Sequence, residues 1–114
     1  MGMVTMGKWV ALSALLLSAS SASAMDPAIR CQADKLKIAA KYTFCRLKAE
    51  ADAARTFAAP EFAKCDAAFA AGWAQAESRA LGKGTPCWTS GDASVVQGDL
   101  AEQSGALADH LAGK

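Results

Sequence analysis

Apolar residues recur three or four positions apart along three stretches of this chain, and this spacing is typical of amphipathic α-helices. The first stretch runs from Ala28 to about Arg55 without a Gly or a Pro, and good helix formers dominate it. Asp26 and Pro27 suit the start of a helix, because Asp can cap unpaired N–H groups and Pro lacks an N–H that would need a partner. At ~1.5 Å per residue, this predicted helix is roughly 42 Å long.

The first predicted helix has two opposite apolar faces when residues are placed about 100° apart. One face holds Ile29, Ala33, Leu36, Ala40, Phe44, Leu47, Ala51 and Ala54. The other holds Cys31, Ile38, Tyr42, Cys45 and Ala49, and one seam between the faces holds Arg30, Lys37, Lys41 and Lys48. A surface helix needs only one apolar face, so we predict that other helices cover this one from both sides.

Two further helices complete the pattern. Pro60 is predicted to begin a second helix that ends near Leu81, where glycines and Pro86 stop it. Its apolar face contains Phe62, Cys65, Phe69, Trp73, Ala76 and Ala80. A third helix is predicted from a capping box at residues 89–92 to about Ala112. Its apolar row contains Ala93, Val96, Leu100, Gln103, Leu107 and Leu111. The predicted fold class is therefore all-α: a disulfide-stapled antiparallel hairpin with a third helix packed on it, forming a small three-helix bundle. We expect Leu36, Ala40, Phe44 and Leu47 to face that third helix.

The first 24 residues have the order of a secretory signal peptide. Lys8 precedes the apolar run Trp9–Leu17, which is too short to span a bilayer as a helix. Small residues follow and end in Ala22-Ser23-Ala24, which fits an A-x-A cleavage site. We predict a signal peptide over 1–24 and an exported, periplasmic or extracellular domain over 25–114, with a short membrane anchor as the alternative. No later apolar run predicts a transmembrane segment.

Charge argues against a nucleic-acid partner. Only Lys8 of the 12 Lys and Arg residues lies in the predicted signal peptide, which leaves 11 basic residues against 11 acidic ones. A neutral domain is not suited to binding phosphates. The charges are nevertheless segregated, since residues 30–48 hold six basic residues and one acid, and the third helix holds acids without Lys or Arg. We predict that these two helices pack with complementary charges.

All four cysteines lie in the predicted exported part, where an even number favours disulfides. Cys31 and Cys45 are separated by 14 residues of helix. That separation is roughly 21 Å, whereas bridged Cα atoms lie within about 7 Å. Folding the second helix back antiparallel brings Cys87 level with Cys31 and places Cys65 near Cys45, with some stagger. We therefore predict the pairs Cys31–Cys87 and Cys45–Cys65, because the crossed pairs need a large axial slip.

Three segments carry a resemblance to a known type of module. They are CQADKLKIAAKYTFCRLKAEA at 31–51, FAKCDAAFA at 62–70 and CWTSGDA at 87–93. Together they resemble a four-cysteine helical module found in uncharacterised exported bacterial proteins, and they span most of residues 25–114. The resemblance implies a helical fold outside the cytoplasm and carries no activity with it.

The sequence offers little for catalysis. Its single histidine, His110, lies near the end of the third helix, and no Ser or Cys stands in a recognisable nucleophile setting. We predict that the protein is not an enzyme and needs no cofactor. An alternative is a soft-metal site of the Cu(I) type, with Cys31, Cys45, Cys65 and Cys87 as thiolates inside the bundle.

The candidate interaction face consists of Leu36, Phe44, Leu47, Trp73 and Trp88. Apolar rows at helical spacing more often belong to a core than to an interface. We predict an exported, non-enzymatic structural or protein-interaction module. A further alternative is a secreted membrane-active helical effector that opens at its third helix. The pattern specifies neither a partner nor an oligomeric state.

Overall fold

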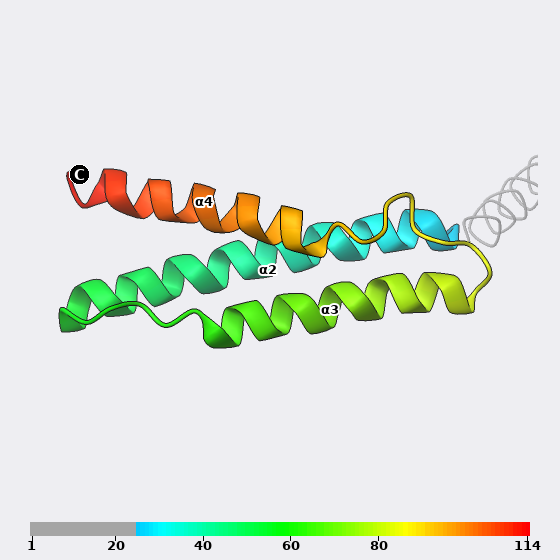
Figure 1. The fold of residues 1–114 in the computed structure, drawn as a ribbon, viewed down its shortest axis with the longest axis horizontal. Coiled ribbons are helices and arrows are strands. Elements are labelled where there is room, and N and C mark those ends of the chain that lie inside the picture. The colour runs from blue at the N-terminus through cyan, green and yellow to red at the C-terminus, as the bar shows by residue number, and fades with distance from the viewer. Residues whose placement is uncertain (1–24) are drawn as a thin grey trace, which may run out of the picture.

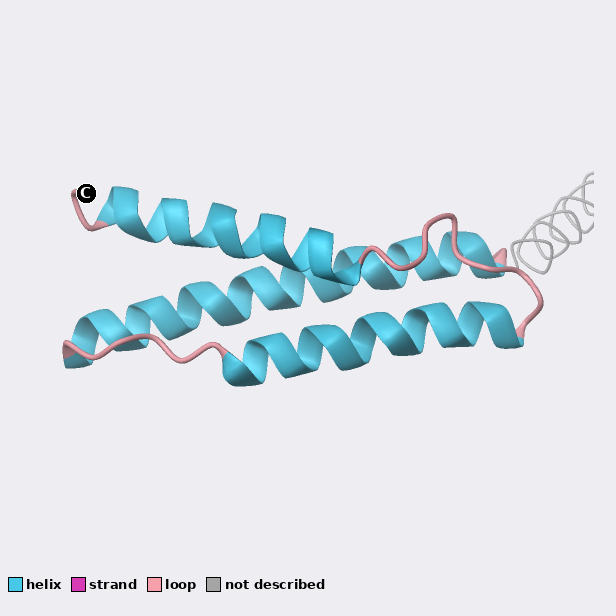
Figure 2. Cartoon of the chain, in the orientation of Figure 1, coloured by secondary structure: helices cyan, strands magenta, loops and turns pink. Residues whose placement is uncertain are grey.

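The computed structural model describes residues 25–114, and three helices make up most of this part (Figures 1 and 2). Helix α2 spans Pro27–Thr56, α3 spans Ala63–Gly82 and α4 spans Ala93–Leu111. No strand occurs between residues 25 and 114, so the predicted all-α fold class is confirmed. The predicted signal peptide, residues 1–24, lies outside the described residues.

Helix α2 begins and ends where local chemistry requires it. The carboxylate of Asp26 accepts a 2.8 Å hydrogen bond from the N–H of Ala28 and so caps the helix. At the other end Phe57 adopts a left-handed conformation, with φ of 55°, and its N–H bonds to the carbonyl of Ala53. A left-handed residue after the last turn reverses the chain direction.

Helix α3 starts at Ala63, three residues later than the prediction at Pro60. Residues 57–62 instead form a loop that runs back along α2 before α3 begins (Figure 2). A loop covers up to about 3.3 Å per residue, compared with ~1.5 Å in a helix. The loop therefore removes the stagger between Cys45 and Cys65 that a helix starting at Pro60 would leave.

Helices α2 and α3 form an antiparallel hairpin, and α4 lies across it with its C-terminus on the same side as the end of α2 (Figure 1). The main core consists of buried Tyr42, Cys65, Phe69 and Trp73. The first half of α4 packs against this core with Ala93, Val96 and Leu100. Three neighbouring aromatic rings dominate it, with centroids 5.0 Å apart for Tyr42–Phe69 and 4.9 Å for Phe69–Trp73.

The two disulfides are Cys31–Cys87 and Cys45–Cys65, with Cα–Cα distances of 5.6 Å and 5.7 Å. These are the pairs that the sequence predicts. One bridge joins the start of α2 to the segment after α3, and the other joins the middle of α2 to the start of α3. Disulfides of this kind are compatible with an oxidising compartment.

The expected position of α4 on α2 is wrong for Leu36, Ala40 and Phe44, whereas Leu47 is half-buried and lines a groove that α2 shares with α4. Leu36 and Phe44 are 61% and 71% exposed, and Ala40 is exposed as well, so α4 does not cover this part of α2. Helix α4 instead lies over the boundary between α2 and α3, because there its apolar row covers aromatic rings of both helices. In that row Ser104 is buried, at 3% exposure, whereas the expected Gln103 is exposed.

Candidate functional site

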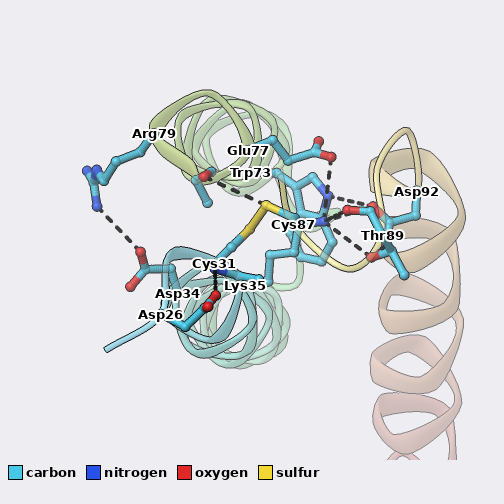
Figure 3. Close-up of a disulfide and its surroundings, with 12 residues drawn as sticks. Asp26, Cys31, Asp34, Lys35, Trp73, Glu77, Arg79, Cys87, Thr89 and Asp92 are labelled. Carbon is cyan, nitrogen blue, oxygen red and sulfur yellow. Dashed lines mark hydrogen bonds and ion pairs between the residues drawn. A yellow bond between two sulfur atoms is a disulfide. The ribbon is translucent and has the colours of Figure 1, made fainter. Parts of the chain in front are cut away.

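The most unusual polar group in the fold is Lys35 of α2, which is only 4% exposed (Figure 3). Its ammonium group donates to the carbonyl oxygen of Thr89 at 2.9 Å and to a carboxylate oxygen of Asp92 at 3.2 Å. A carboxylate oxygen of Glu77 lies 3.5 Å away, and the ring centroid of Trp73 lies at 4.8 Å. Lys35 therefore ties α2 to α3 and to the segment that leads into α4.

Asp92 is the anionic centre of the same cluster. It accepts hydrogen bonds from the indole N–H of Trp73 at 3.0 Å and from the hydroxyl of Thr89 at 2.7 Å, besides the bond from Lys35. Burial alone would raise the pKa of Asp92, but these hydrogen bonds outweigh it and lower the pKa to about 2. Asp92 is also the residue at which α4 begins, although its side chain makes no capping hydrogen bond. Its carboxylate therefore serves the cluster rather than the helix terminus.

A buried lysine beside a carboxylate with a shifted pKa can mark a catalytic site. Here the polar partners of Lys35 are groups of the protein itself, and they all lie at one junction of three segments. We interpret the cluster as a joint that fixes the start of α4.

A second cluster accompanies the Cys45–Cys65 bridge. The hydroxyl of Tyr42 donates to Asp66 at 2.7 Å, and Arg46 donates to the same hydroxyl at 3.2 Å. The guanidinium of Arg46 also lies 3.7 Å from the ring centroid of Phe62, which is a favourable cation–π geometry. This contact holds the loop end before α3 against α2. Each disulfide thus has a cation, an aromatic ring and a carboxylate beside it.

The cysteines do not form a common site. All four are bridged, and Cys31 and Cys45 stand at different levels of α2. Within residues 25–114, no group of three or more His, Cys, Asp or Glu side chains is placed to hold a metal ion. The Cu(I) hypothesis requires four thiolates in one place, and sulfur atoms in disulfides are not thiolates. The oxidised structure therefore gives that alternative no support.

The expected interaction face is only partly present. Leu36, Phe44 and Trp88 are well exposed, and Leu47 is half-buried. Trp73 is 4% exposed and its indole N–H is bonded to Asp92, so its assignment to this face is wrong. The reason is the position of α4, which covers Trp73 and leaves Leu36 and Phe44 open.

An apolar groove, which the sequence analysis did not predict, lies between the C-terminal halves of α2 and α4. It has a volume of about 630 Å³, and its lining includes Leu47, Ala54, Phe57, Leu107 and Leu111. Phe57, at one edge, is 99% exposed. The apolar rows of α2 and α4 were visible in the sequence, but the divergence of the two helices that opens the groove was not.

Comparison of this chain with protein-family models, with curated proteins and with solved structures finds no match. The function must therefore be argued from the geometry of this chain alone. None of the helices between residues 25 and 114 is long and apolar enough to cross a membrane.

Proposed function

We propose that the protein is an exported, non-enzymatic interaction module, a small helical scaffold that holds one face of α2 ready for a partner. The observation that carries this proposal is the exposure of Leu36 and Phe44, at 61% and 71%, on the helix that both disulfides hold. Together with the exposed Ala40 between them they form a continuous apolar row, and this favours a binding role because monomeric proteins rarely expose large contiguous apolar patches.

Export is part of the proposal. The signal-like residues 1–24 and two disulfides in a small domain both favour an oxidising compartment, either the periplasm or the cell exterior. The four-cysteine resemblance favours the same location. We propose a non-enzymatic role because the polar groups with unusual surroundings form hydrogen bonds to other groups of the protein at helix junctions. Lys35 and Asp92 do so at the start of α4, and Arg46 does so near the start of α3.

The proposal is tested by placing a photo-crosslinking amino acid at position 44 and, in a second variant, at position 78. Phe44 lies on the exposed face of α2, whereas Ser78 is an exposed residue of α3. In the envelope of the host cell, we expect adducts from position 44 and none from position 78. The absence of adducts from position 44 would show that this face binds nothing, and equal yields from both positions would show that it is not a specific binding surface.

A further inference from the structure

The outward face of α2 carries an apolar row and a basic row side by side. At about 100° per residue, Ile29, Leu36 and Phe44 lie within one quarter of the helix circumference. The neighbouring sector holds Arg30, Lys37, Lys41 and Lys48, all of them exposed. At ~1.5 Å per residue, the apolar row extends for roughly 22 Å along the helix and the basic row for roughly 27 Å. Ala40, which is also exposed, lies between Leu36 and Phe44 in the apolar row.

The four cations of this row are electrostatically uncompensated within residues 25–114, where none of them forms an ion pair. The other cations of α2 are all paired: Lys35 with Asp92, Arg46 with Asp66, and Arg55 with Asp52. Asp34, the nearest acid by position on the helix, is paired with Arg79 of α3 at 3.4 Å. The basic row is therefore a local positive surface on a domain whose total formal charge is zero.

The acids of α4 do not neutralise this surface. Glu102 and Asp109 are exposed, and they lie on the side of α4 opposite to Leu100, which packs against the core. Since α4 turns Leu100 toward the other helices, these acids point away from α2. The molecule thus separates a basic, apolar face on α2 from an acidic face on α4.

We propose that the outward face of α2 docks onto an anionic membrane surface, with Leu36 and Phe44 inserted at the headgroup level and the basic row against lipid phosphates. This inference rests on the proposed function and names the partner of that face. A helix that shows aliphatic and aromatic residues beside Lys and Arg is the type that lies in a bilayer interface. Long basic side chains can reach phosphates while the apolar row is inserted.

A second copy of the chain is the main competitor as a partner, because its acidic α4 has the complementary charge. The exposed side of α4 offers Val95, which is 65% exposed, as its large apolar residue next to these acids. That side chain cannot cover both Leu36 and Phe44 along α2. A lipid surface can bury the apolar row among its headgroups and bind the basic row through its phosphates at the same time. Docking needs no opening of α4, since this face is already exposed.

The test uses the exported protein with both disulfides intact and vesicles of phosphatidylcholine, with or without one quarter phosphatidylglycerol. We expect co-sedimentation with the anionic vesicles only, weakened by salt because screening reduces the attraction. The variant Lys37→Gln/Lys41→Gln is expected to bind about 30-fold more weakly, since each cation near an anionic surface contributes about fivefold. Lys64→Gln/Lys114→Gln removes the same charge from exposed positions of α3 and of the C-terminus, and it should bind within about twofold of the parent protein.

Phe44→Ser tests the apolar row and should weaken vesicle binding about tenfold, with an unchanged helical circular dichroism spectrum. Equal binding to both kinds of vesicle, or equal losses in the two double variants, would overturn the membrane proposal. So would a vesicle-independent, concentration-dependent dimer that Phe44→Ser abolishes, because it would assign the face to a protein partner. These failures differ from failure of the proposed function, in which position 44 gives no crosslinked adduct at all.

Discussion

Replacing Asp92 by Asn tests whether the Lys35 cluster stabilises the fold through charge. Lowering the pKa of Asp92 from 3.8 to about 2 corresponds to at most about 2.5 kcal/mol of stability at neutral pH. Water reaches 28% of the Asp92 side chain, which screens part of this energy. We therefore expect Asp92→Asn to lower the free energy of unfolding by about 1.5 kcal/mol at pH 7. Loss of a helix cap does not contribute, because the Asp92 side chain makes no capping bond and Asn caps equally well.

The effect must depend on pH with a defined sign. The pKa is lower in the folded state, so the unfolded state binds more protons between the two pKa values and stability rises with pH there. The contribution of Asp92 is complete above about pH 5 and is lost as the pH falls through about 2. Near pH 2 the difference between the two proteins should shrink below about 0.5 kcal/mol.

The measurement is urea unfolding followed by far-UV circular dichroism, with both disulfides intact, at pH 7 and pH 2 and constant ionic strength. Asp99→Asn is the matched control, since Asp99 is an exposed acid of the same helix and forms no ion pair within residues 25–114. This control should stay within about 0.3 kcal/mol of the parent at both pH values. An Asp92→Asn difference that is the same at pH 7 and pH 2 would refute the electrostatic reasoning.

Two further predictions concern the bridges and α4. Replacing both cysteines of the Cys31–Cys87 bridge by Ser should cost about 4 kcal/mol in urea unfolding, compared with about 3 kcal/mol for Cys45–Cys65, because the bridges close loops of 56 and 20 residues. Equal costs, or a larger cost for the shorter loop, would show that native contacts rather than loop entropy decide. Leu107→Asp should change stability by less than about 1 kcal/mol, since Leu107 is 45% exposed, whereas Leu100→Asp places a charge against the core and should unfold the domain. Thermal melts of the two variants compare these effects directly, and a large loss in Leu107→Asp would mean that α4 lies closer to α2 than described.

The parts of the structure that follow from helical rise and periodicity were accessible from the sequence. The helices and the pairs Cys31–Cys87 and Cys45–Cys65 depend on distances along one axis, which residue counting supplies. The angular position of α4 around the hairpin was not accessible in this way. It depends on the competition between an aliphatic row on α2 and the aromatic rings shared by α2 and α3. Helix α4 packs against the aromatic rings, so Trp73 is buried in the core and Phe44 is exposed.

The same helical geometry explains why the predicted charge pairing between α2 and α4 is nearly absent. Lys35 and Lys37 are close in sequence, but about 200° of helix rotation separates them. A helix that packs on α2 can therefore reach only one of the two sides. Helix α4 takes the side of Lys35, where Asp92 forms its ion pair, and the row that includes Lys37 keeps its charge. A count of basic residues in one helix and acidic residues in another overestimates how many of them form ion pairs. Only the charges on the side of each helix that faces the other can pair. The uncompensated basic row is thus a consequence of where α4 packs, and that row is what gives α2 its capacity to bind an anionic surface.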